Sequence, residues 1–135
     1  MNSKIFGAVF FLSALILISC EKPAGQGGTS NIKGKIFVKD FNSAATAEIG
    51  EFYGVGETVY ISYGDDKAVG NSVKTGADGT FEFLYLNKGK YTVFAVSRDT
   101  SVHVSGSDKV LPVSVEVNIT EGNKTYEVGD VIINQ

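Results

Sequence analysis

Apolar and polar residues alternate with a period of two over most of the chain after residue 32, and this pattern limits the chain to β structure. The clearest case is residues 111–119, where five apolar residues alternate with three polar residues and a proline. A period of two belongs to a strand with one buried face, whereas an amphipathic helix repeats every 3.6 residues. No stretch beyond residue 32 keeps the helical period. The chain is therefore expected to fold as an all-β domain.

Seven strands are predicted, with turn signals such as Asp78-Gly79 between them. They lie at residues 32–39, 58–63, 71–75, around 81–83, 91–97, 111–119 and 126–134. Alternation on one side only is typical of a sandwich, in which each sheet buries one face and exposes the other. We therefore expect a seven-stranded antiparallel sandwich. Phe81 and Phe83 share one face of their strand and are expected in its core.

The N-terminal segment has the features of an export signal. Lys4 precedes an apolar run of 14 residues, 5–18, which Glu21 and Lys22 close off. A membrane-spanning helix needs about 20 apolar residues, so this run is short for one. Its length and flanks are those of a secretory signal peptide, predicted at residues 1–19.

The only cysteine, Cys20, directly follows this segment. The sequence Leu17-Ile18-Ser19-Cys20 resembles the lipobox of bacterial lipoproteins. The resemblance implies cleavage before Cys20, diacylglycerol on its thiol, and a further acyl chain such as palmitate on the new amino terminus. Each buried methylene adds about 0.8 kcal/mol of membrane affinity, and stable anchoring takes about two chains. Cys20 is therefore predicted as a lipid attachment site in the bacterial cell envelope. Glu21 favours the outer membrane and leaves the leaflet open.

The chain from Cys20 onward is long enough for one domain. Residues 20–31 are poor in apolar side chains and are expected to form a flexible tether, with the β-sandwich domain at residues 32–135. The remaining chain holds eleven basic and fifteen acidic side chains, a net charge of −4, and no basic cluster. Nucleic acid is therefore not expected as a partner, and anionic headgroups are poor candidates for direct binding.

The stretch TGADGTFEFLYLNKGKYTVFAVS, residues 75–97, resembles the carboxypeptidase-regulatory-like domains of exported bacterial proteins. The shared pattern is a turn ending in Asp-Gly, two aromatic residues two apart, a leucine, and Gly-x-Tyr before a strand. It falls on Asp78, Gly79, Phe81, Phe83, Leu86, Gly89 and Tyr91. The resemblance implies a prealbumin-like (transthyretin-like) Greek-key sandwich without catalytic machinery. It also implies that the Tyr91 hydroxyl bonds to nearby backbone, as at a tyrosine corner.

Collagen-adhesin B-type domains, which share this architecture, form an internal isopeptide bond between a lysine and an asparagine or aspartate. In that family a glutamate four residues after the Gly-x-Tyr tyrosine catalyses the bond. The matching position here is Ala95, although Lys35 and Asn134 could supply the two ends. No crosslink is therefore expected.

Catalytic and metal sites are not predicted. His103 is the only histidine, which argues against a Ser-His-Asp triad or a histidine-based metal cluster, and it is expected in a solvated loop. Asp65 and Asp66 lack the oxygen ligands of a calcium loop and are expected at a solvated turn. We therefore expect a non-enzymatic protein without a cofactor.

Two features suggest a binding role. Residues 41–56 form a long connection that contains Phe52 and Tyr53, and such loops tend to be functional or disordered. Alternation also turns Phe37, Tyr60, Phe94 and Val96 outward, where they would form one apolar patch if the strands carrying them are neighbours. The candidate ligand contacts are therefore Phe52, Tyr53, Tyr60 and Phe94. Three readings stay open: a protein partner, a glycan that stacks on the aromatics, or a connection that covers the patch as a lid.

Overall fold

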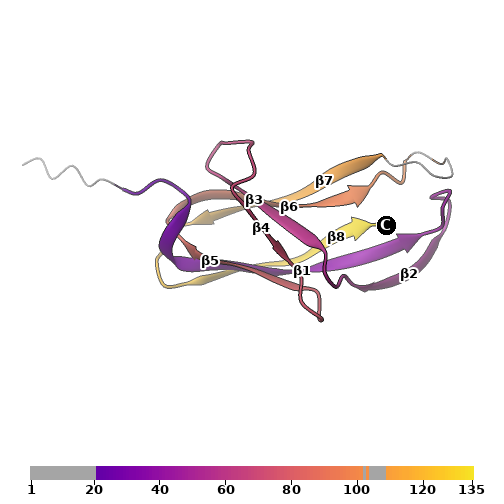
Figure 1. The fold of residues 1–135 in the computed structure, drawn as a ribbon, viewed down its shortest axis with the longest axis horizontal. Helices are drawn as coiled ribbons and strands as arrows, with labels where there is room; N and C mark the ends of the chain where they lie inside the picture. Colours follow the sequence, from indigo (N-terminus) through magenta and orange to yellow (C-terminus); the bar gives the residue numbers. More distant parts are fainter. Residues whose placement is uncertain (1–20, 102, 104–108) are drawn as a thin grey trace, which may run out of the picture.

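The computed structural model describes residues 21–101, 103 and 109–135, which form eight β-strands in two sheets (Figure 1). The predicted signal peptide and Cys20 lie outside the described residues. The strands are β1 (Gln26–Phe41), β2 (Glu48–Tyr53), β3 (Thr58–Tyr63), β4 (Asn71–Lys74), β5 (Thr80–Leu86), β6 (Gly89–Arg98), β7 (Val110–Ile119) and β8 (Thr125–Asn134). The described part of the chain contains no helix with the length and apolar character needed to cross a membrane.

The first sheet is antiparallel throughout, with the order β4-β3-β6-β7. The second sheet is built around the long strand β1. Strand β8 pairs with β1 over residues 31–39, while β5 pairs with residues 26–35 and β2 with residues 37–41. Because β8 runs beside both parts, β5 and β2 share the opposite edge of β1. The two sheets pack face to face as a sandwich (Figure 1).

The strand pairing corrects the expected antiparallel arrangement at one place. Strands β1 and β8 are parallel, and the other five pairings within the described residues are antiparallel. A parallel pair needs a long crossover connection. Here nearly the whole domain forms that connection, so no local turn signal could have revealed it.

The structure has one strand more than the seven predicted, and this additional strand is β2. It lies within residues 41–56, which were expected to form a long loop. It pairs with only one end of β1, and most of its residues are exposed. Ile49, Phe52 and Tyr53 are 65%, 46% and 43% exposed. The segment extends the second sheet sideways as an edge strand and does not lie over Tyr60 and Phe94 of the other sheet. The reading of the connection as a lid over the outward aromatic patch is therefore wrong.

Strand β1 also starts earlier than the sequence suggested. Residues 26–31, expected in the flexible tether, belong to this strand. Ser30 is buried, and its Oγ donates to the Glu121 carbonyl over 2.8 Å. A Cβ at Gly28 would lie 2.0 Å from the Leu86 carbonyl oxygen, so only glycine permits this close approach. Composition misleads here because the strand is held by backbone pairing and not by apolar side chains.

The core lies between the sheets, and the prediction for Phe81 and Phe83 is confirmed. They are 1% and 2% exposed, and their rings pack edge to face at 6.1 Å. Around them lie the inward residues of the other strands: Ile32, Ile36, Val38, Val59, Ile61, Leu86, Tyr91, Val93, Ala95, Ile119, Val131 and Ile133.

The predicted role of Tyr91 is also confirmed. Its hydroxyl lies 2.7 Å from the Asn87 carbonyl oxygen and 3.1 Å from that of Gly25, and it accepts the Gly25 N–H over 2.9 Å. The side chain therefore ties the start of β6 to the segment that enters β1.

Candidate functional site

The four candidate contact residues do not form one site. Tyr60 and Phe94 lie on the outer face of the β4-β3-β6-β7 sheet, whereas Tyr53 lies on the outer face of the β1 sheet. Phe52, the neighbour of Tyr53, points to the other side of β2. The single patch expected from Phe37, Tyr60 and Phe94 is thus wrong, because Phe37 belongs to the opposite outer face.

Tyr60 and Phe94 form an aromatic pair in the middle of their sheet. They are directly opposite each other in the β3–β6 register, and their rings stack at a centroid distance of 5.2 Å and an interplanar angle of 20°. Both are partly exposed, and the neighbouring Val96 is 44% exposed. Cross-strand aromatic pairs form readily because opposite side chains on one face are within contact distance.

A shallow hollow lies beside this pair, with Phe94 and Pro112 as its apolar lining. Its polar lining comes from the hydroxyls of Ser62, Thr92 and Ser114 and from Asp66 and Lys67 on the β3–β4 turn. The hollow therefore combines an aromatic ring with groups that can donate and accept hydrogen bonds.

Tyr53 is engaged in contacts within the protein. Its ring packs edge to face on Phe37 at 5.3 Å, and the Lys35 Nζ lies 4.7 Å from the ring centroid. Its hydroxyl donates to the Asp130 carboxylate over 3.3 Å. With the Lys35 ammonium over it, the ring is less free to receive a ligand than the Tyr60–Phe94 pair.

The rest of the outer face of the β1 sheet carries exposed ion pairs between lysine and acidic side chains. Lys39 forms ion pairs with Glu51 at 3.2 Å and Glu48 at 3.4 Å, and these carboxylates, Glu51 first, raise the pKa of the Lys39 ammonium. Lys35 lies 3.7 Å from Asp78. Exposed pairs of this kind contribute little stability, so the face is mainly a solvated polar surface.

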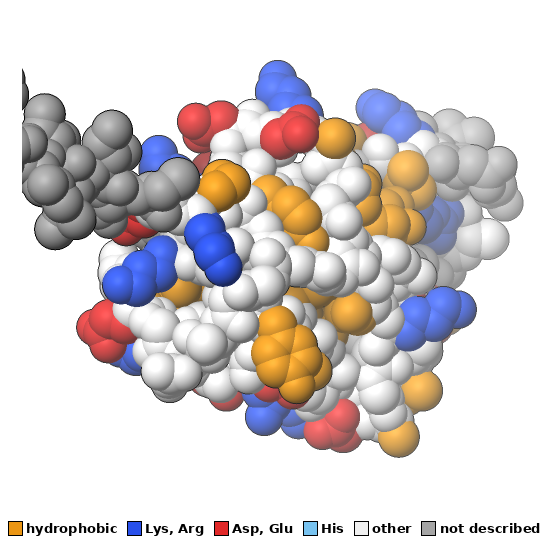
Figure 2. Space-filling view, turned by 60° about the vertical axis from the view of Figure 1, so that its left-hand side comes forward, with side chains coloured by type: hydrophobic (Ala, Val, Ile, Leu, Met, Phe, Trp, Pro, Cys, Tyr) orange, Lys and Arg blue, Asp and Glu red, His pale blue; other side chains and the backbone are white. Residues whose placement is uncertain are grey.

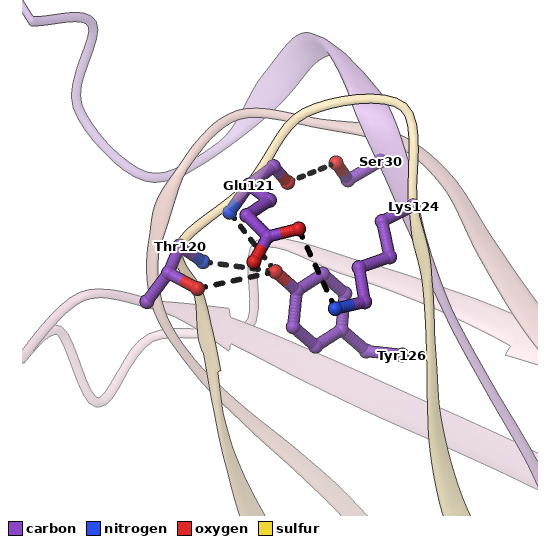
Figure 3. A network of polar contacts seen from close by, with 5 residues as sticks. All are labelled: Ser30, Thr120, Glu121, Lys124 and Tyr126. Carbon is purple, nitrogen blue, oxygen red and sulfur yellow. Dashed lines mark hydrogen bonds and ion pairs between the residues drawn. The ribbon is translucent and has the colours of Figure 1, made fainter.

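The polar networks at the two ends of the sandwich are structural. At one end, the Tyr126 hydroxyl accepts the N–H groups of Thr120 and Glu121 over 3.1 and 2.9 Å, and Ser30 donates to Glu121 (Figure 3). The hydrogen bond with the Thr120 hydroxyl is the main cause that lowers the pKa of Tyr126. This network ties the turn between β7 and β8 to β1.

At the other end, Asp99 holds the chain that follows β6. Its buried carboxylate accepts the Ser101 hydroxyl and N–H over 2.6 and 3.0 Å and pairs with Lys109 at 3.0 Å. These hydrogen bonds lower the pKa of Asp99 to about 2, and the hydrogen bond from the Ser101 hydroxyl contributes most.

The predicted position of His103 in a solvated loop is confirmed, because the residue is exposed. Its Nδ1 lies 2.9 Å from the Ala45 carbonyl oxygen.

One exposed aromatic residue, Tyr85, was not predicted from the sequence. Tyr85 is 66% exposed and has a φ of 58°, next to Leu84, which is 44% exposed. The signal was present in the sequence, because Leu84-Tyr85-Leu86 breaks the alternation of β5. Such a break marks a bulge, and the pairing of β1 with β5 is irregular at this place.

On the face shown in Figure 2 the exposed apolar side chains lie in several separate patches between charged and polar groups. Within the described residues, no three His, Cys, Asp or Glu side chains are grouped so that they could hold a metal ion.

No protein-family model matches the chain, and no curated protein matches it. Among solved structures, the chain is similar to the crystal structure of a candidate carbohydrate-binding protein from Pseudomonas aeruginosa. The two share 15% sequence identity with a TM-score of 0.49, over 83% of this chain and 92% of that chain. A similarity of this size carries no conclusion about family or ligand.

Proposed function

We propose that the chain is a lipid-anchored lipoprotein of the bacterial cell envelope, and that its β-sandwich is a non-enzymatic binding or structural module. The observation that carries the proposal is Cys20, which ends a 14-residue apolar segment in a lipobox-like sequence. The first strand of the described sandwich begins at Gln26, shortly after this cysteine. Glu21 after the cysteine favours the outer membrane.

The prealbumin-like, Greek-key assignment belongs to the same proposal. It is supported by the residue pattern from Asp78 to Tyr91 and by the hydrogen bond of the Tyr91 hydroxyl to the Asn87 carbonyl. Domains of this family serve as accessory, adhesive or folding modules, which fits a binding role.

The contact surface in this proposal is the outer face around Tyr60 and Phe94. The two rings stack on each other, so they do not lie side by side as one flat platform. Val96 and Pro112 extend the apolar area at their side. This shape favours a protein partner, since interface centres are rich in aromatic residues.

A glycan is the second candidate, and the hollow beside Phe94 favours it. Sugar rings stack their apolar face on an aromatic ring and hydrogen-bond through their hydroxyls. The hollow offers Phe94 together with Ser62, Thr92, Ser114 and Asp66.

The anchor is tested by detergent phase partition after expression in a lipidating bacterial host. The wild type is expected in the detergent phase, and Cys20→Ser in the aqueous phase, because two or more acyl chains bind membranes firmly. Incorporation of labelled palmitate into the wild type alone is the second readout. A wild type that partitions like the variant would contradict the proposal.

The two ligand classes are separated by a glycan array probed with the Cys20→Ser chain. Binding that falls at least about tenfold in Phe94→Ala, the loss of about 1.4 kcal/mol, supports a glycan. The matched control is Ile49→Ala, which removes an exposed apolar side chain on β2. If the chain binds no glycan on the array, the protein-partner candidate stands alone.

A further inference from the structure

The segment between Cys20 and β1 is fixed to the sandwich and is not a free tether. Ala24 packs against the core, and the Gly25 N–H donates to the Tyr91 hydroxyl over 2.9 Å. Asn87 binds the same segment through two hydrogen bonds. Its backbone N–H donates to the Gly25 carbonyl over 2.8 Å, and its side-chain Nδ2 donates to the Pro23 carbonyl over 3.2 Å. The chain is therefore attached to the domain from Pro23 onward.

This attachment limits how far the domain can lie from an anchor on Cys20. Two residues, Glu21 and Lys22, lie between Cys20 and Pro23. The chain therefore takes three residue steps of at most about 3.6 Å each, so the limit is about 11 Å. The headgroup layer on each side of a bilayer is about 5 to 8 Å thick, half the difference between a total of about 40–45 Å and a core of about 30 Å. A domain held this closely touches the headgroups.

The end of the sandwich that faces the bilayer is then defined, and we call it the anchor end. It consists of residues 21–25, the β5–β6 turn at residues 87–88 and the β7–β8 turn at residues 120–124 (Figures 1 and 3). The β1–β2 turn at residues 42–47 lies at the opposite end of the molecule (Figure 1).

Tyr85 and Leu84 are exposed at this same end. The Tyr85 N–H donates to the Asn31 side chain over 3.2 Å, and the Asn31 N–H donates to the Lys124 carbonyl in the β7–β8 turn over 2.9 Å. A φ of 58° is an outlier for a bulky residue such as Tyr85, and it marks local backbone strain. Tyrosine is enriched at membrane–water interfaces, where its ring is in apolar contact and its hydroxyl is hydrated.

We propose that Tyr85 and Leu84 insert into the headgroup region of the bilayer that holds Cys20, and so fix the sandwich upright with its anchor end on the membrane. This inference rests on the lipid anchor of the proposed function. Lys22, Lys88 and Lys124 at this end are partly balanced by Glu21 and Glu121. The contact therefore depends on the short connection and on apolar side chains, and not on attraction to anionic lipid.

The sequence offers a clean test because the chain contains no tryptophan. Tyr85→Trp places a single tryptophan at the anchor end, and Ile49→Trp places one on β2 at the far end. The two replaced residues are 66% and 65% exposed, so they are matched in solvent accessibility. Each full-length protein is lipidated in a bacterial host and reconstituted into vesicles that contain brominated lipids.

For Tyr85→Trp we expect a blue-shifted emission and quenching several-fold stronger than for Ile49→Trp. Circular dichroism checks the fold, and Leu84→Trp is the second reporter if Tyr85→Trp does not fold. Equal quenching at the two ends, in proteins that float with the vesicles, would overturn the orientation and leave the anchor intact. If neither protein floats, the anchor is wrong and the orientation falls with it.

A second variant tests the short connection. An insertion of about ten Gly and Ser residues between Glu21 and Lys22, in the Tyr85→Trp chain, gives the domain a flexible tether. The protein should still float, but its quenching should fall to the level of Ile49→Trp. Quenching that stays unchanged would overturn the role of the short connection.

Discussion

Two tyrosines in contact show how one hydroxyl can stabilise the fold while another does not. Tyr63 and Tyr91 pack edge to face at 5.8 Å, and burial raises the pKa of both. The Tyr91 hydroxyl bonds to Gly25 and Asn87, whereas the buried Tyr63 hydroxyl has no hydrogen-bond partner among the described residues. A buried hydroxyl without a partner costs free energy, because it loses its hydrogen bonds to water.

Replacement of each tyrosine by phenylalanine should therefore change the free energy of unfolding differently. Tyr91→Phe leaves the Gly25 N–H without its partner and should lower the free energy of unfolding by about 1 to 3 kcal/mol. Tyr63→Phe removes the unpaired oxygen and should leave this free energy unchanged or raise it. Urea denaturation of the two variants measures both effects. A Tyr63→Phe variant as unstable as Tyr91→Phe would mean that a bound water satisfies the hydroxyl.

Asp99 makes stability depend on pH. Its folded-state pKa of about 2 lies below the unfolded value of about 3.9. A carboxylate with a depressed pKa contributes stability above its unfolded pKa, and this contribution is lost as the pH falls through the folded value. The urea midpoint of the wild type should therefore fall more steeply between about pH 4 and pH 2 than that of Asp99→Asn. Parallel curves for the two proteins would contradict the role of Asp99.

At the residue scale, the sequence predicted positions that depend on local pattern and missed those that depend on distant partners. Tyr91 could be predicted because its partner Asn87 is four residues away in a known motif. Tyr126 could not, because its network also involves Ser30 from the first strand. The exposed Tyr85 was visible only as a break in alternation, which does not say that the side chain faces solvent.

At the element scale, strands β5 and β2 differ in what they contribute to stability. Phe81→Ala or Phe83→Ala should cost about 3 to 5 kcal/mol, since both rings are fully buried. Phe52→Ala should cost at most about 1 kcal/mol, the scale of exposed positions. Tyr53→Ala should lie between them, at about 1 to 2 kcal/mol, because the aromatic contact with Phe37 is lost. Chemical denaturation orders the four variants, and a Phe52→Ala cost equal to that of Phe81→Ala would mean that β2 covers the core.

Alternation along a strand predicts which side chains point outward, but it does not predict to which sheet the strand belongs. This is why Tyr60, Phe94 and Phe37 were all expected on the surface and only the first two meet there. Strand β2 escaped prediction for a related reason. Neither of its faces is buried, so its sequence shows no period of two.

At the scale of the whole molecule, the parallel pairing of β1 with β8 joins the first and last strands. This pairing also fixes the positions of Lys35 and Asn134, the two residues that an internal isopeptide bond would join. Lys35 is opposite Asp130, whereas Asn134 is opposite Lys39. At about 3.3 Å per residue, an offset of four residues puts Lys35 and Asn134 about 13 Å apart along the strands.

No internal crosslink is therefore expected, for a reason independent of the missing catalyst. Ala95 is buried on β6 at the position where collagen-adhesin B-type domains have glutamate, and the two reactive ends are also out of reach. Lys35 is further held by Asp78 and by the ring of Tyr53. Peptide mapping by mass spectrometry should recover the Lys35 and Asn134 peptides separately, in the wild type and in Ala95→Glu alike. A joined pair of peptides, lighter by one ammonia, would contradict the β1–β8 register in either protein. If it formed only in Ala95→Glu, catalysis and not distance would be the limit.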